Sequence, residues 1–144
     1  MFEMDKRLVG DTVELGDFAL SRVLLMNDSR YPWLILVPRV VDASEVFDLQ
    51  LEQQQELWQE TQIVAHALKH EFAADKINIA TLGNVVSQLH MHIVVRMQND
   101  EAWPAPIWGR GIAQPYSESA LIEMRTRLQA ALAAHLMTDK KVGL

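Results

Sequence analysis

Residues 88–95 read QLHMHIVV, a stretch in which apolar side chains alternate with a glutamine and two histidines. In a β-strand, side chains two positions apart point to the same face of the sheet. One face of this strand is therefore apolar and carries Leu89, Met91, Ile93 and Val95. The other face carries Gln88, His90 and His92. The pattern predicts a strand that packs its apolar face into a core and presents two imidazoles together on the opposite face.

Three interpretations of His90 and His92 fit this pattern. They are side chains without a role on a half-exposed strand, or two ligands of a metal site, or groups that take part in catalysis. A metal site needs a third ligand, which Asp100 or Glu101 could supply. In catalysis, a neutral imidazole serves as nucleophile or general base, while its neighbour orients it or donates a hydrogen bond to an anion. The strand alone leaves the three interpretations open.

The rest of the chain predicts an α+β fold. Strand character is found in residues 12–15, 18–26, 33–38, 76–81 and 89–95. Helices are predicted for residues 51–72 and 117–137, and Asp42 with Glu45 resembles the start of a short helix that ends near Leu49. Tight turns between strands favour an antiparallel sheet of about five strands with helices packed on one face. No linker or repeat divides the chain, so we predict a single domain over residues 1–144.

A second histidine pair, His66 and His70, lies on the predicted long helix at the spacing of zinc-binding His-Glu-x-x-His helices. Position 67 is alanine, so the general-base glutamate of such enzymes is missing. The pair also lies opposite the apolar stripe of the helix, which favours solvent-exposed side chains. His135, late in the last helix, is likewise interpreted as structural.

The segment 99–111, NDEAWPAPIWGRG, is a loop rich in tryptophan, proline and glycine. Trp103 and Trp108 either anchor an ordered surface loop or form a lid that stacks on a base or ring near the histidine strand. Asn27 lies in a polar turn, where its amide could also form a hydrogen bond with a sugar hydroxyl. These three residues are therefore candidates for ligand binding.

Composition limits the partners and the location that we expect. The chain has 144 residues, is 49% hydrophobic and contains no cysteine, which excludes disulfides, thiol catalysis and cysteine-ligated zinc. A net charge of −6 argues against nucleic acid polymers as partners, whereas a few local groups could still hold a small phosphorylated ligand. The apolar runs are too short to span a membrane, and residues 1–16 lack the apolar core of a secretory signal. We therefore expect a cytoplasmic protein that does not contact membranes.

The stretch 83–96, GNVVSQLHMHIVVR, resembles the signature of the histidine-triad (HIT) nucleotide-binding family, in which three histidines alternate with apolar residues on one strand. Residues 26–49, MNDSRYPWLILVPRVVDASEVFDL, resemble an earlier segment of that family, where an asparagine precedes a buried strand that ends at proline. The resemblance covers residues from about 18 to 97. It implies an antiparallel sheet with helices on one side, and a homodimer that shares the sheet.

The resemblance also implies a hydrolase or transferase without a cofactor, which cleaves a purine nucleotide conjugate at the α-phosphate. Such conjugates are dinucleoside polyphosphates, nucleoside phosphoramidates and adenylates. His90 matches the nucleophile, which forms a nucleotidyl-histidine intermediate that water resolves, and His92 matches a residue that contacts phosphate oxygens. Asn27 matches the position that meets the ribose, and Asn84 matches a polar residue near the phosphate. The attacking histidine must be neutral, and a protonated neighbour would neutralise the phosphate.

Gln88 is where this chain departs from the family pattern, because the first histidine of the triad is absent. An amide donates and accepts hydrogen bonds but does not carry a proton at neutral pH. If position 88 mainly orients the nucleophile, or acts through its backbone carbonyl, glutamine suffices. If position 88 moves a proton to the leaving group, the protein is instead a nucleotide-binding module with little or no turnover.

Overall fold

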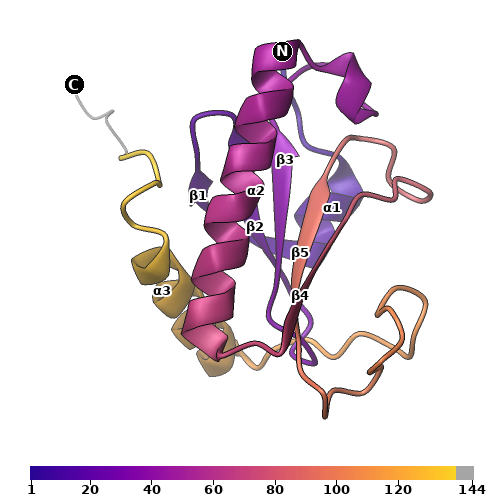
Figure 1. The fold of residues 1–144 in the computed structure, drawn as a ribbon, viewed down its shortest axis with the longest axis vertical. Helices are drawn as coiled ribbons and strands as arrows, with labels where there is room; N and C mark the ends of the chain where they lie inside the picture. Colours follow the sequence, from indigo (N-terminus) through magenta and orange to yellow (C-terminus); the bar gives the residue numbers. More distant parts are fainter. Residues whose placement is uncertain (139–144) are drawn as a thin grey trace.

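The computed structural model describes residues 1–138 of the chain. Within them, five strands form one antiparallel sheet in the order β1-β2-β3-β5-β4 (Figure 1). The strands are β1 (Thr12–Asp17), β2 (Ser21–Met26), β3 (Trp33–Pro38), β4 (Lys76–Ala80) and β5 (Met91–Arg96). This sheet confirms the predicted α+β fold. Residues 139–144, which the prediction of a single domain included, lie outside the described part of the chain.

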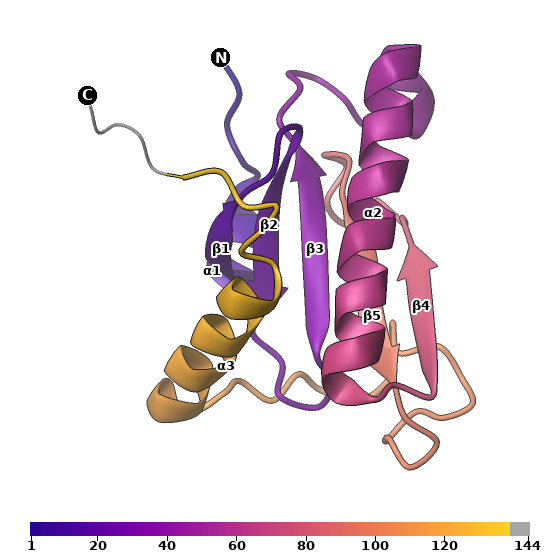
Figure 2. The same ribbon diagram turned by 60° about the vertical axis from the view of Figure 1, so that its left-hand side comes forward.

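Two long helices, α2 (Leu51–Phe72) and α3 (Glu118–Ala131), cover one face of the sheet (Figure 2). The apolar side of the histidine motif is buried beneath them, as the alternation predicts, through Leu89, Met91, Ile93 and Val95. α2 adds Leu57, Val64 and Leu68 to the same core, and α3 adds Leu128. In the described residues, no helix is both long enough and apolar enough to cross a membrane.

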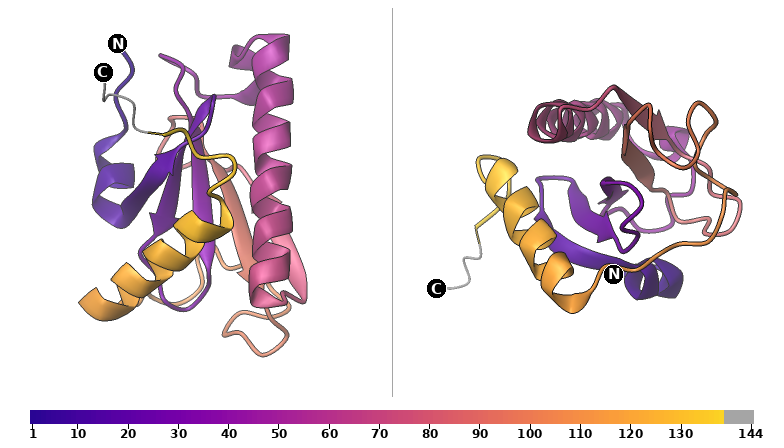
Figure 3. Two further views of the ribbon diagram at one scale, coloured as in Figure 1. Left: turned by 90° about the vertical axis from the view of Figure 1, so that its left-hand side faces the viewer. Right: turned by 90° about the horizontal axis from the view of Figure 1, so that it is seen from below.

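The opposite face of the sheet is also covered, which the sequence did not predict. A short helix, α1 (Lys6–Asp11), packs Leu8 into a second buried cluster. That cluster also contains Trp33 and Ile35 of β3 and Ile107 from the loop after β5. Figure 3 shows α1 and α2 on opposite sides of the sheet. The face that carries the two histidines is therefore enclosed by the N-terminal residues and by the loop after β5.

Several predicted boundaries differ from the structure. β1 continues to Asp17 rather than ending at residue 15, and β2 begins at Ser21 rather than at residue 18. Asp42 has a φ of 62° and does not begin a helix; instead, the carboxylate of Asp48 accepts hydrogen bonds at the start of a short 3₁₀ turn, Val46–Asp48. The last helix ends at Ala131 rather than near residue 137, because the following residues form turns. β5 begins at Met91, so His90 lies immediately before the strand rather than inside it.

A buried ion pair anchors the first half of the loop after β5. Arg96 at the end of β5 is only 2% exposed, and its Nε donates to the carboxylate of Asp100 over 2.8 Å. The same guanidinium donates to the carbonyl of Ala105 and to the side-chain oxygen of Asn78 on β4. A buried arginine with several charge-assisted hydrogen bonds holds its partners in one geometry. This half of the loop is therefore fixed to the sheet.

A second ion pair anchors the other half of the loop. Arg30, in the turn after β2, donates to the buried carboxylate of Asp28 over 2.8 Å and to the carbonyl of Arg110. Burial by itself raises the pKa of Asp28, but the hydrogen bonds from Arg30 and from the backbone outweigh burial and lower it. The pair therefore stays charged near neutral pH and ties the loop to the turn that contains Asn27.

We expect Asp100→Ala to destabilise the protein by about 3–5 kcal/mol, because the substitution leaves the buried guanidinium of Arg96 without its carboxylate. The change is measured as the free energy of unfolding in urea. The matched control is Glu71→Ala, which breaks the half-exposed pair Arg127–Glu71 and should cost no more than about 1 kcal/mol. Equal effects of the two substitutions would contradict an anchoring role for Asp100.

Candidate active site

His90 is held by the backbone of the residue two positions before it. Its Nδ1 lies 2.7 Å from the carbonyl oxygen of Gln88. A carbonyl oxygen only accepts hydrogen bonds, so Nδ1 of His90 must carry the ring proton. The lone pair of a neutral His90 is then on Nε2. His90 is nearly buried, at 6% exposure, so its ring is fixed as well as its tautomer.

His92 has the opposite arrangement. The indole Nε1 of Trp33 donates to Nδ1 of His92 over 3.0 Å, and an indole nitrogen only donates. Nδ1 of His92 is therefore the unprotonated nitrogen, and Nε2 carries the hydrogen. Burial, followed by the neighbouring charge on His90, lowers the pKa of His92 to about 3. His92 is thus neutral at physiological pH, in contrast to the protonated neighbour that the sequence analysis considered.

The two imidazoles therefore present different groups at a short separation. Their ring centroids lie 4.8 Å apart, with the planes at 73° to each other. His90 offers a lone pair on Nε2, and His92 offers an N–H on Nε2. A lone pair beside a fixed N–H can act as a nucleophile next to a hydrogen-bond donor.

Both histidines open into a cavity of about 340 Å³ on the α1 side of the sheet. Its apolar lining includes Leu8, Met26, Trp33 and Ile35. Asn84 is an exposed residue of the cavity lining, in the segment between β4 and the motif. Gly83 in that segment has a φ of +75°, a left-handed conformation that glycine adopts without strain. The cavity combines an apolar interior with a few polar groups, as small-molecule sites do.

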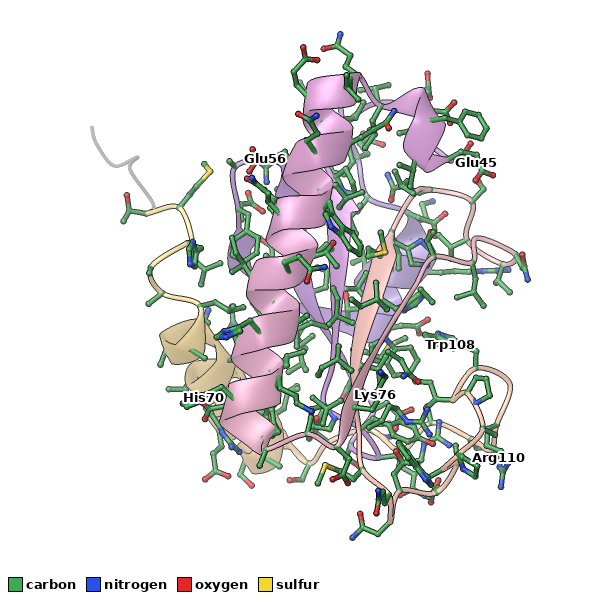
Figure 4. The ribbon with its side chains drawn as sticks, viewed as in Figure 1. Glu45, Glu56, His70, Lys76, Trp108 and Arg110 are labelled. Atoms are coloured by element: carbon green, nitrogen blue, oxygen red, sulfur yellow. The ribbon has the colours of Figure 1, made fainter. Side chains whose placement is uncertain are left out.

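Trp108 lies beside the histidines, whereas Trp103 does not. The ring of Trp108 meets His92 edge-on, with centroids 5.3 Å apart, and both residues line the cavity. In the described residues, the buried indole Nε1 of Trp108 has no hydrogen-bond partner. Trp103 instead lies against the guanidinium of Arg96, with 5.5 Å from the guanidinium carbon to the ring centroid. Figure 4 shows Trp108 and Arg110 on the loop after β5.

Asn27 borders an adjoining cavity of about 360 Å³, which shares Trp33 and Trp108 with the histidine cavity. Its side-chain oxygen accepts a hydrogen bond from the backbone N–H of Tyr116 over 2.9 Å. This contact orients the amide, so that its NH₂ group is the part available to a ligand. Asn27 is thus next to the site, and its carbonyl oxygen is already engaged.

Gln88 contributes to the site through its backbone and not through its side chain. Its carbonyl oxygen contacts His90, as described above. Its side-chain amide faces away from the histidines and lines a separate cavity of about 610 Å³ with residues 1–6. There Oε1 accepts from the N–H of Asp5 and Nε2 donates to the carbonyl of Glu3, each over 2.8 Å. The amide of Gln88 therefore binds the N-terminal segment.

The acids that the sequence analysis considered as a third metal ligand are engaged elsewhere. Asp100 is bound by Arg96, and Glu101 is exposed with its carboxylate 3.4 Å from Arg30. Across residues 1–138, no three histidine, cysteine, aspartate or glutamate side chains are arranged to hold a metal ion. The three remaining histidines are exposed around a groove between α2 and the end of α3, where Figure 4 labels His70; they are His66, His70 and His135.

Most residues of the cavity lining were not identified from the sequence, and Trp33 and Arg7 are the two that bear most on its chemistry. Trp33 begins a continuous apolar strand, so its position indicated only a core residue. Arg7 lines the cavity from α1, and its Nη1 lies 3.5 Å from the carbonyl oxygen of Val85. No periodic pattern signalled α1, which has six residues and one buried side chain. The contact between residues 7 and 85 is therefore visible only in the structure.

Comparisons with known proteins identify the family of this chain. The family model described as HIT domain matches residues 7–99, more than half of the chain. The chain is 44% identical to a histidine triad protein from Sinorhizobium meliloti 1021 (TM-score 0.89; 92% of this chain and 98% of that chain covered). It is also 44% identical to one from Marinobacter aquaeolei VT8 (TM-score 0.91; 94% and 98% covered). It shares the fold of a diadenosine triphosphate hydrolase from Plasmodium falciparum at 17% identity (TM-score 0.61; 93% and 80% covered). No curated protein sequence matches it.

We expect His92 to make the protein less stable as pH falls. Between its folded pKa of about 3 and the ordinary value of 6.5, the unfolded chain binds a proton that the folded protein does not. Stability should therefore fall by up to about 1.4 kcal/mol per pH unit across this window from this residue. His92→Asn, which does not titrate and keeps an acceptor for Trp33, should remove this part of the slope. Urea unfolding at several pH values measures both proteins, and parallel stability curves would contradict the assignment.

Proposed function

Because this chain belongs to the HIT family, we propose that it binds a purine nucleotide conjugate beside His90 and cleaves it at the α-phosphate. Dinucleoside polyphosphates, nucleoside phosphoramidates and adenylates are the conjugates of this kind. The observation that carries the proposal is the pair of opposite tautomers, in which His90 offers a lone pair and His92 offers an N–H. The cavity beside the two histidines has apolar side chains in its lining, which suit a nucleobase.

In the proposed reaction, Nε2 of His90 attacks the α-phosphorus. A nitrogen–phosphorus bond forms, the bond from phosphorus to the leaving group breaks, and the leaving group departs with the electron pair and takes a proton from solvent. Water then attacks the same phosphorus and loses a proton to solvent, the nitrogen–phosphorus bond breaks, nucleoside monophosphate is released, and free His90 is regenerated. Nδ1–H of His90 remains on the carbonyl of Gln88 throughout, which stabilises the imidazolium-like ring of the intermediate.

Three further residues are proposed to bind the nucleotide. Nε2–H of His92 would donate to a phosphate oxygen, and Asn84 at the cavity edge would contact the phosphate as well. The NH₂ group of Asn27 would donate to a ribose hydroxyl, since its oxygen is engaged by Tyr116. Trp108 is proposed to stack or hydrogen-bond on the ligand, because its buried Nε1 has no partner within residues 1–138. Trp103 is anchored on Arg96, which favours the surface-loop interpretation for that residue.

A second candidate is a nucleotide-binding module with little turnover. It is favoured by one observation: the side chain at position 88 is an amide that binds the N-terminal segment, so it does not supply a proton to the leaving group. The orientation of His90 does not depend on that side chain, because the backbone carbonyl of Gln88 provides it. We therefore favour the enzyme over the binding module. The expected partner is the same small nucleotide for both candidates. The cytoplasmic location stays a prediction.

His90→Ala should reduce release of nucleoside monophosphate by at least ~10³-fold, because the covalent route is lost. Release is followed by chromatography during incubation with diadenosine polyphosphates, an adenosine phosphoramidate and an adenylate analogue. The control is His66→Ala, which removes an exposed histidine on α2 and should leave release unchanged. Equal release by His90→Ala and the wild type would contradict the assignment of His90 as the nucleophile.

Incubation of the wild-type protein with the same conjugates distinguishes the two candidate functions. A turnover enzyme should carry a nucleotidyl group on the peptide that contains His90 after rapid quenching at alkaline pH, where phosphoramidates survive. A binding module should instead show a higher melting temperature with adenosine monophosphate, while every conjugate stays intact.

We further propose a homodimer formed through β4. This strand is an edge of the sheet, and an edge presents backbone N–H and C=O groups that can pair with a second copy. Amides of residues 76–80 should exchange hydrogen more slowly as protein concentration rises, whereas those of the other edge strand, β1, should not change. Sedimentation velocity over the same concentrations should show a dimer. A monomer throughout would exclude this assembly.

A further inference from the structure

The side chain of Gln88 acts as a clamp on the N-terminal segment. A primary amide carries an acceptor and two donors side by side, so it can pair with a backbone N–H and a backbone C=O at the same time. Gln88 does this with the N–H of Asp5 and the carbonyl of Glu3, which flank Met4. A neutral imidazole has one donor and one acceptor on separate parts of its ring, and it does not match this pair of groups. Glutamine at position 88 thus has a role that histidine does not fill.

The clamp fixes the start of α1. Asp5 is the residue that caps this helix, and its carboxylate accepts from the backbone N–H of Arg7 over 2.8 Å. Gln88 therefore holds the first residue of a short rigid unit, and Arg7 lies two residues further along. The two neighbouring cations of α1 then face different cavities, because Arg7 lines the histidine cavity and Lys6 lines the one beside Gln88.

Among its described lining residues, the histidine cavity has one lysine or arginine, which is Arg7, and one carboxylate, which is that of Asp11. A nucleoside monophosphate carries close to two negative charges at neutral pH. His92 is neutral there, as its buried position requires. His92 thus provides a hydrogen bond without a full positive charge, and the charge of the phosphate needs another partner. A guanidinium matches two phosphate oxygens in a forked geometry.

We infer that Arg7 binds the phosphate of the nucleotide, and that Gln88 is a positioning residue that holds Arg7 at the cavity by clamping residues 3–5. This inference rests on the proposed function, since it takes a nucleotide as the ligand. The phosphate contact comes from the N-terminal helix and not from the histidine motif alone.

The test compares the binding of adenosine monophosphate and of adenosine by calorimetry. Arg7→Ala should weaken the binding of the monophosphate by roughly tenfold and leave the affinity for adenosine unchanged, because adenosine lacks the charged phosphate that Arg7 binds. Arg7→Lys should restore part of the loss. Lys6→Ala is the matched control: it removes the same charge from the adjacent residue of α1 but faces the other cavity, and both affinities should stay at the wild-type value.

A second set of variants tests the clamp. Gln88→Met keeps the length of the side chain and loses both hydrogen bonds. It should therefore lower the affinity for the monophosphate but not the affinity for adenosine. Combined with Arg7→Ala, it should add little to the loss, since both changes remove the same contact. The backbone amide of Asp5 should also lose its protection from hydrogen exchange in Gln88→Met. A full additive loss in the double variant would overturn the positioning role of Gln88.

The outcomes separate this inference from the proposed function. If the wild type binds neither ligand, the proposed function falls and the inference falls with it. If the wild type binds the monophosphate more tightly than adenosine, and Arg7→Ala keeps the same preference, the inference alone is overturned. A loss that is equal for both ligands in Arg7→Ala would mean a structural effect, and it would also overturn the inference.

Discussion

The hydrogen bond from the indole of Trp33 to Nδ1 of His92 is the constraint on which the chemistry of the site depends. An indole nitrogen has one possible role, so the bond determines the tautomer of His92 and places its ring hydrogen on Nε2. The register of the two central strands produces this contact. Trp33 of β3 is opposite Val94 of β5, and His92 is two residues before Val94 on the same face. A shift of one residue would turn the imidazole into the apolar core under α2.

The apolar side of β5 protects that register. Met91, Ile93 and Val95 are buried between the sheet and the long helices, so sliding the strand would expose them and bury polar side chains. The same alternation therefore specifies both the core and the direction of the histidines. Stability and chemistry are coupled in this strand, because the register that buries its apolar side also brings His92 to Trp33 and so sets the tautomer of His92.

Much of the fold and part of the site could be predicted from the sequence. What decides this is whether a residue's role follows from a local pattern or from a distant contact. The faces of β5 and the burial of the α2 stripe follow from periodicity, which is a local signal. The clamp of Gln88 on Glu3 and Asp5 joins residues more than 80 positions apart, and no local pattern encodes such a contact. α1 escaped prediction for the same reason, since a six-residue helix depends on tertiary packing of Leu8 rather than on its own propensity. The tautomers likewise depend on partners that only the folded chain brings together.

The distribution of charge makes Arg7, in the N-terminal helix, the cation that lines the histidine cavity. The protein has a net charge of −6, so its long-range field repels phosphates, and any attraction must be local. Two other arginines, Arg30 and Arg96, are each buried against a carboxylate and hold the loop after β5. Arg7 contacts a backbone carbonyl instead, so its charge is not neutralised by that partner. An acidic surface with one cation at the cavity favours a small phosphorylated ligand over a long anionic polymer, which would meet the repulsive field along its whole length.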